Sequence, residues 1–256
     1  MVTPNSLPPY QYLDLPGNLR LAYLDVGPRQ APVLLFLHGM GDHGLIWKPQ
    51  LAALQQHYRC IAVDLPGHGQ TQCSTFNCRM FDFAAALTQF IQVLKLPPLT
   101  LIGHSMGGQI AVVLALGYAA QIEKLVLIAP AGFEQFTESE KRMLQFGASL
   151  HNSWGGTESS ALPQKEILQK SMKGMLDEPV FEHLPQLRQP TLIIFGDHDP
   201  FIPNRYLHHQ TTAAVAQAGA AQIPNAELHL LKNCGHYPQL DYPQQVNTLL
   251  QFFLGE

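Results

Sequence analysis

Residues 99–108 constrain the fold of this chain more than any other stretch. The apolar run at its start predicts a short buried strand over residues 99–102. Small and apolar residues over 109–120 predict a helix directly afterwards. A Gly-x-Ser-x-Gly pentapeptide joins the two. In that setting the pentapeptide fits a sharp turn from strand to helix, with Ser105 exposed at the tip.

Two glycines make such a turn possible. The serine at the tip has a strained backbone, and strand and helix can pass closely only where side chains are nearly absent. Gly103 and Gly107 meet that need on either side of Ser105. The helix behind the serine would direct its N-terminal amides and the positive end of its dipole to the same place. A glycine-rich turn with an incidental serine has the same pattern, so the rest of the chain decides its meaning.

The rest of the chain alternates apolar strands with helices. Strands are predicted over residues 19–26, 31–37, 59–63, 124–129, 191–195 and 227–231, and helices over 45–56, 81–94, 205–218 and 243–254. Continuous apolar runs are typical of strands that are covered on both faces. The alternation therefore predicts an α/β fold, a mostly parallel sheet with helices on both faces.

Polar residues follow the ends of several predicted strands. They are His38, Asp64, Ser105, Asp199 and His236. Ligand sites in open α/β sheets lie at the carboxyl ends of the strands. We therefore expect these side chains at one edge of the sheet, where a site would form.

Residues 132–188 interrupt the alternation, because they contain aromatic residues and methionines but no strand-like run. We predict that 132–188 form a helical cap over the active edge, inserted into a core domain of residues 1–131 and 189–256. The length of 256 residues and the 46% of hydrophobic residues suit one core with such an insertion.

Charge and cysteine content exclude several classes of protein. The net charge is −4 and no basic cluster is present, so we expect no nucleic-acid partner. The four cysteines have neither disulfide-framework nor zinc-ligand spacing. Residues 1–9 lack the charged and apolar parts of a signal peptide, and no apolar run reaches transmembrane length. We expect a cytoplasmic protein with free thiols and no stable membrane insertion.

Ser105, Asp199 and His236 occur in this order, each just past a predicted strand. A serine hydroxyl is a poor nucleophile at neutral pH and needs a neutral imidazole to accept its proton. The imidazole in turn needs a buried carboxylate that fixes its tautomer and stabilises its charged form. The order serine, acid, histidine is that of α/β-hydrolases.

The chain resembles the α/β-hydrolase superfamily, in its branch of small capped serine esterases. The matching motifs are His38-Gly39, Asp-Leu-Pro-Gly-His-Gly at 64–69, Gly-His-Ser-Met-Gly at 103–107, Gly-Asp-His-Asp at 196–199 with Pro203, and Gly235-His236. These motifs are specific for the fold and the triad, and they are poor guides to the substrate.

The resemblance implies a role for each triad residue. Ser105 would be the nucleophile, and His236 the general base and then the general acid. Asp199 would orient His236, and Asp197 is the rival acid. The family spacing from the glycine that ends the strand to a later proline favours Asp199.

The oxyanion hole would consist of the backbone N–H groups of Met40 and Met106, with the two side chains in the acyl pocket. For Asp42 and His43 we expect bracing of the loop that contains Met40, with contact to the substrate as the alternative. The substrate pocket is predicted to be lined by His38, Gly39, Trp47, His104, Phe133, Phe136, Met143 and Trp154.

The leading hypothesis is a serine hydrolase that cleaves a carboxylic ester of a small or medium apolar substrate through an acyl-enzyme, with no cofactor and no metal. One alternative keeps the triad for carbon–carbon bond hydrolysis, perhydrolysis or lyase chemistry. An arginine of the cap that binds a substrate carboxylate would favour some of these, and Arg142 and Arg188 are the candidates. A second alternative is a receptor-like ligand-binding protein with residual hydrolase activity. A substrate carried on a protein also stays open.

Overall fold

The computed structural model describes residues 9–150 and 164–255, and these contain one nine-stranded sheet. Its order is β1-β2-β4-β3-β6-β7-β8-β9, with β5 paired to β2. The strands are β1 (Gln11–Leu15), β2 (Leu19–Val26), β3 (Val33–Leu37), β4 (Arg59–Val63), β5 (Gln72–Cys73), β6 (Leu99–His104), β7 (Ile122–Ile128), β8 (Thr191–Gly196) and β9 (Ala226–Leu231). All neighbours from β4 to β9 are parallel, whereas β1, β2 and β5 pair antiparallel.

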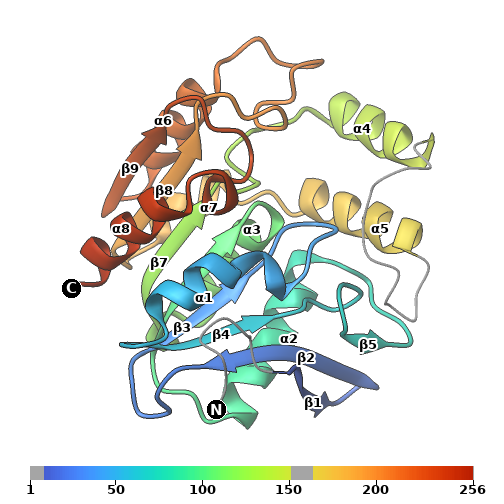
Figure 1. The fold of residues 1–256 in the computed structure, drawn as a ribbon. Helices are drawn as coiled ribbons and strands as arrows, with labels where there is room; N and C mark the ends of the chain where they lie inside the picture. The colour runs from blue at the N-terminus through green and yellow to red at the C-terminus, as the bar shows by residue number, and fades with distance from the viewer. Residues whose placement is uncertain (1–8, 151–163, 256) are drawn as a thin grey trace.

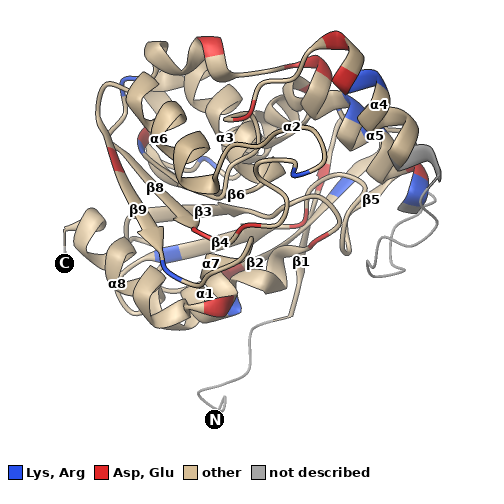
Figure 2. Cartoon of the chain, turned by 90° about the horizontal axis from the view of Figure 1, so that it is seen from above, with Lys and Arg blue, Asp and Glu red and all other residues tan. Residues whose placement is uncertain are grey.

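Helices cover both faces of this sheet. They are α1 (Lys48–Leu54), α2 (Met80–Val93), α3 (Met106–Gly117), α4 (Glu138–Leu150), α5 (Gln164–Asp177), α6 (Thr212–Gln222), α7 (Pro238–Asp241) and α8 (Pro243–Leu254), with short 3₁₀ turns η1 (Gly44–Trp47), η2 (Ala119–Gln121) and η3 (Phe181–Gln186). On one face lie α1 and α8, and on the other α2, α3 and α6 (Figures 1 and 2). The predicted fold class is confirmed.

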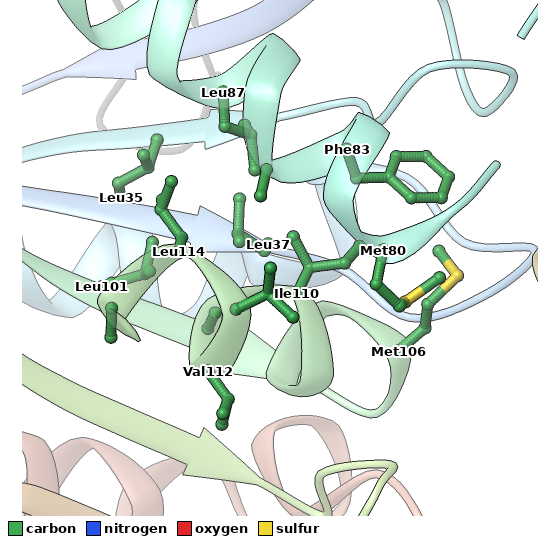
Figure 3. Close-up of a cluster of buried hydrophobic side chains, with 14 of the residues drawn as sticks. Leu35, Leu37, Met80, Phe83, Leu87, Leu101, Met106, Ile110, Val112 and Leu114 are labelled. Carbon is green, nitrogen blue, oxygen red and sulfur yellow. The ribbon is translucent and has the colours of Figure 1, made fainter. Parts of the chain in front are cut away.

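Each central strand supplies side chains to two separate cores. Along β3, Leu35 and Leu37 join the core beneath α2 and α3, whereas Leu34 and Phe36 join the core beneath α1 and α8. Figure 3 shows the first of these cores, where Leu35 and Leu37 meet Ile110 and other residues of α2 and α3. Because successive side chains of a strand point to opposite faces, a strand buried on both faces must be apolar throughout.

Two edge strands and the start of one helix differ from the prediction. Strand β1 is half exposed and β5 has two residues, so neither has the long apolar run of a central strand. Helix α6 begins at Thr212, and residues 205–211 form turns and irregular structure. The hydroxyl of Thr211 accepts a hydrogen bond from the N–H of Ala214, an N-cap that fixes the helix start.

The described part of residues 132–188 contains α4, α5 and η3 and no strand. Helices α4 and α5 lie beyond the carboxyl ends of the central strands (Figure 1). The division of the chain into a core domain and a cap stays a prediction. Among the described residues, no helix combines the length and the apolar character that a membrane crossing requires.

Candidate active site

The turn between β6 and α3 holds Ser105 in a strained conformation, with φ 53° and ψ −119°. A Cβ atom on Gly103 would lie 2.4 Å from the carbonyl oxygen of Gly107. One on Gly107 would lie 2.4 Å from the carbonyl oxygen of Leu37 in β3. Any side chain at these two positions would therefore push strand and helix apart, so both glycines are required by the close approach.

A chain of hydrogen bonds connects Ser105, His236 and Asp199. The Nε2 atom of His236 lies 3.0 Å from Ser105 Oγ, and its Nδ1 atom lies 2.7 Å from Asp199 Oδ2. The other oxygen of the buried Asp199 accepts the N–H groups of Phe201 and Ile202 at 2.8 and 3.0 Å. A carboxylate held in this way keeps a proton on Nδ1 and leaves Nε2 free to accept the serine proton.

Asp197 does not reach His236. Its carboxylate lies 2.6 Å from His198 Nδ1, on the surface of the same loop. The hydrogen bond from His198 lowers the pKa of Asp197 below its usual value. Of the two candidate acids, the fold therefore brings Asp199 and not Asp197 to the imidazole.

The backbone N–H groups of Met40 and Met106 stay the predicted oxyanion donors. Met106 is the first residue of α3, where N–H groups have no partner within the helix. A Cβ on Gly39 would lie 3.2 Å from Ser105 Cβ, so the loop that leads to Met40 lies close to the serine. The Met40 side chain lines the cavity, but that of Met106 is buried in the core near Met80 (Figure 3). The expectation of a pocket position for the Met106 side chain is wrong, because α3 directs it toward α2.

A cavity of about 630 Å³ opens beside Ser105 and His236. This volume lies within the range of small-molecule sites. The lining from α4, α5 and the segment after α5 contains the apolar residues Leu144, Leu168, Met172, Met175, Leu176, Pro179 and Phe181, together with the polar Lys141, Glu182 and His183. Of the predicted pocket residues, Gly39, His104 and Phe136 line this cavity.

His38 does not line the cavity. It is fully buried, its Nε2 atom accepts the N–H of Leu65 at 2.9 Å, and its Nδ1 atom lies 2.7 Å from the carbonyl oxygen of Gly39. Burial lowers the pKa of this imidazole well below its usual value, so it is neutral. His38 thus connects the loop after β3 to the loop after β4, and the pocket prediction for it is wrong.

Three further pocket predictions are not met. Trp47 is buried in the core against Phe36, and Phe133 is buried against Phe195, so both serve packing rather than the cavity. Met143 is 57% exposed on α4 and does not line the cavity. Trp154 lies outside the described residues.

Most apolar residues that line the cavity were not predicted, although their spacing in the sequence indicates a shared helix face. Leu168, Met172 and Met175 lie at i, i+4 and i+7 of α5, the spacing of one helix face. Tyr237 also lines the cavity and directly follows His236. Phe201 lies with its ring 5.1 Å from that of His236. Its position in the loop of Asp199 was the only sequence signal for it.

Asp42 lines the cavity and is mostly buried. Burial raises the pKa of its carboxyl from 3.8 to about 6, against the smaller opposite effects of Tyr237 and His236. Its expected bracing role agrees with a long hydrogen bond of 3.4 Å from the Tyr237 hydroxyl to Oδ2.

The substitution Asp42→Asn is expected to make the free energy of unfolding less dependent on pH. A carboxyl whose pKa is higher in the folded chain contributes stability that is complete below pH 3.8 and is lost as the pH rises through about 6. An amide does not titrate, so the variant should gain about 2–3 kcal/mol over the wild type between these pH values. Urea unfolding at a series of pH values measures this, with the exposed Asp14→Asn as a matched control. Identical pH dependence in wild type and Asp42→Asn would contradict the expectation.

Comparison with known proteins identifies related chains along most of this sequence. A model described as "Alpha/beta hydrolase family" matches residues 34–249. The pimeloyl-(acyl-carrier protein) methyl ester esterase of Nitrosospira multiformis is 30% identical, over 84% of this chain and 92% of that protein. The monoacylglycerol lipase ABHD6 of Homo sapiens is 26% identical, over 89% of this chain and 77% of that protein. A hydrolase from Pseudomonas aeruginosa PA01 shares the fold, with a TM-score of 0.82 at 21% identity and coverage of 96% and 98%.

Proposed function

The chain belongs to the alpha/beta hydrolase family, and we propose that it is a serine hydrolase that cleaves carboxylic esters through an acyl-enzyme. The observation that carries this proposal is the hydrogen-bonded series from Ser105 through His236 to the buried Asp199. This series ends on a cavity with an apolar wall. A hydroxyl activated in this way attacks an acyl carbon.

In the proposed reaction, Ser105 Oγ attacks the ester carbonyl while His236 Nε2 accepts its proton. The N–H groups of Met40 and Met106 stabilise the oxyanion that forms on the carbonyl oxygen. His236, now an imidazolium paired with Asp199, protonates the leaving alcohol and frees it. A water molecule then loses a proton to His236 and attacks the acyl carbon. As the bond from this carbon to Ser105 Oγ breaks, His236 returns the proton to Oγ, and the acid is released.

The cavity supports a small or medium apolar substrate. Leu168, Met172 and Met175 form an apolar strip of α5 that lines the cavity, and this strip suits an acyl chain. Two relatives carry names that denote ester hydrolysis, a methyl ester esterase and a monoacylglycerol lipase. These names support an ester as the substrate class, and we infer its apolar character from the wall of the cavity.

The alternative reactions of the same triad have less support. Those that require a substrate carboxylate would be favoured by an arginine in the pocket, and neither Arg142 nor Arg188 is among the lining residues. Lys141 lines the cavity, but this lysine forms an ion pair with Glu138 at 2.7 Å. Ester hydrolysis is therefore the proposal.

A free small-molecule ester is favoured over one carried on an acidic protein. Basic and acidic residues are mixed on α4 and α5 (Figure 2). Lys170 pairs with Glu166 and Lys173 with Asp177, so the charges of these lysines are compensated on the same helix. The cytoplasmic location stays a prediction.

Turnover of p-nitrophenyl esters with graded acyl chains tests the proposed function. We expect hydrolysis with a maximum at short or medium chains, since the cavity is about 630 Å³ in volume. Failure of the folded protein to hydrolyse any ester faster than its Ser105→Ala variant would contradict the proposal. Tight binding of a ligand in that case would favour the receptor-like alternative.

Met172→Trp is expected to shorten the preferred acyl chain, because the larger side chain takes up part of the cavity that Met172 lines. The ratio of kcat/KM for long over short esters should fall about tenfold, the scale of one or two methylene groups in an apolar pocket. Met143→Trp is the matched control, since Met143 is exposed on α4 and outside the cavity. An equal change of this ratio in both variants would show that Met172 does not define the acyl site.

A further inference from the structure

A second cluster of titratable side chains lies behind the triad. His104, at the end of β6, is fully buried, and its Nε2 atom lies 2.8 Å from the carbonyl oxygen of His236. A carbonyl oxygen only accepts, so this nitrogen carries a hydrogen. In the neutral ring Nδ1 is then an acceptor, and it has no hydrogen-bond partner in the described structure.

The carboxyl of Asp42 faces this unpartnered nitrogen. Its Oδ2 atom lies 4.0 Å from His104 Nδ1, and the same oxygen accepts the hydroxyl of Tyr237. A Cβ on Gly39 would lie 3.0 Å from His104 Nδ1, 3.1 Å from Asp42 Oδ2 and 3.2 Å from Ser105 Cβ. Both groups therefore border the same small space beside the candidate nucleophile.

If Asp42 were ionised and His104 neutral, two hydrogen-bond acceptors, Asp42 Oδ2 and His104 Nδ1, would face each other in a largely buried place. Such an arrangement is costly unless one proton lies between the two groups. Burial, together with the charge of His236, lowers the pKa of His104 well below its usual value, so the ring does not take the proton. The pKa of Asp42 is raised to about 6 by burial, so below about pH 6 this carboxyl is the group that takes it.

We propose that Asp42 is a positioning residue, whose protonated carboxyl donates a hydrogen bond to His104 Nδ1 and so ties the oxyanion loop to the main chain of His236. This loop comprises residues 39–42 and is closed by a hydrogen bond of 3.2 Å from Asp42 N–H to the carbonyl oxygen of Gly39. The inference rests on the proposed function, because the loop contains the predicted donor Met40.

The charged groups around Asp42 determine how its ionisation affects the reaction. The titratable groups that face Asp42 are Tyr237 and His236 from the loop after β9 and His104 from β6. No lysine or arginine of the described chain forms an ion pair with it. Ionisation therefore breaks the hydrogen bond to His104 and places an uncompensated negative charge beside the site where the oxyanion develops, which slows the reaction at higher pH.

Asp42→Asn and Asp42→Ala separate the donated hydrogen bond from the charge. The asparagine amide can donate to His104 Nδ1 at every pH, and alanine cannot donate at all. We expect the ratio of kcat for Asp42→Asn over wild type to rise at least about threefold between about pH 5 and pH 8, with KM changing less. The ratio for Asp42→Ala should rise as well, because the wild-type kcat falls over this range, but it should lie below the ratio for Asp42→Asn at every pH, since alanine donates no hydrogen bond. Equal losses in both variants at every pH would overturn the proposal, because then the charge of Asp42 is what matters.

A variant of His104 and an NMR measurement test the hydrogen bond from Asp42 separately. His104→Gln keeps an amide donor for the carbonyl oxygen of His236 but removes Nδ1, so in this background the advantage of Asp42→Asn over Asp42→Ala should shrink. Nitrogen-15 NMR of His104, assigned by its loss in His104→Gln, reports the hydrogen bond without any turnover. The Nδ1 resonance should shift between about pH 5 and pH 8 in the wild type and stay constant in Asp42→Asn.

The two proposals fail in different ways. A wild-type protein that hydrolyses no ester contradicts the proposed function, and the NMR titration still decides the role of Asp42. A wild-type esterase whose Nδ1 resonance does not move with pH overturns the role of Asp42 alone. Thermal unfolding of each variant confirms that the comparison is made between folded proteins.

Discussion

Ser105→Ala is expected to lower kcat for ester hydrolysis by about 10⁵- to 10⁶-fold, the loss found when a triad serine is removed. The variant keeps the cavity and the predicted backbone donors, but it lacks the hydroxyl that we propose attacks the acyl carbon. Alanine also lacks the hydroxyl that His236 Nε2 approaches at 3.0 Å. KM should change far less than kcat, because the apolar wall that would hold the acyl chain is untouched.

Intact mass after treatment with a fluorophosphonate probe tests whether Ser105 is a reactive nucleophile, without any ester substrate. The wild type should gain a single adduct, and Ser105→Ala should gain none. Ser74→Ala is the matched control, since this serine is exposed and lies on the loop near β5. An adduct on Ser105→Ala, or esterase activity equal to that of the wild type, would show that another residue is the nucleophile.

Asp199→Asn should lower kcat by about 10⁴-fold, as expected when the acid of a triad loses its charge. The amide would present an N–H group to His236 Nδ1, 2.7 Å away in the wild type. The imidazole would then carry its proton on Nε2 and could not accept the proton of Ser105. The buried imidazolium of the transition state would also lose its counter-charge.

Asp197→Asn is the matched control for this prediction. The two residues share a loop, but Asp197 pairs with His198 at the surface. Its replacement should change kcat by less than about threefold, because exposed ion pairs contribute little. Comparable losses in both variants, at unchanged melting temperature, would assign the role of the acid to the loop as a whole rather than to Asp199.

The fold was predictable because its signals are local. The apolar runs of the central strands mark burial on both faces, and the glycines around Ser105 mark a close approach that the Cβ distances require. The edge strands β1 and β5 escaped detection, since partial exposure weakens their patterns. The predicted start of α6 is wrong because the N-cap at Thr211 begins the helix there, although the preceding residues also have a helical pattern.

The lining of the cavity was less predictable, because it depends on contacts between distant segments. An aromatic residue near the site can pack into the core, as Trp47 does against Phe36. Met143 is exposed on its helix and Met172 lines the cavity, but the residue type alone does not distinguish the two positions. Only the orientation of α4 and α5 over the sheet distinguishes these cases. By contrast, the order of Ser105, Asp199 and His236 along the chain was visible without any structure.

The central strands contribute side chains to two separate cores, and this indicates where stabilising substitutions can be sought. Leu35 and Leu37 share a core with α3, the helix that follows Ser105, whereas Leu34 and Phe36 pack toward α1 and α8. Substitutions at well-separated sites add their effects on stability almost independently. A search for heat-resistant variants can therefore concentrate on the layer between α1, α8 and the sheet, and leave the packing behind α3 as it is.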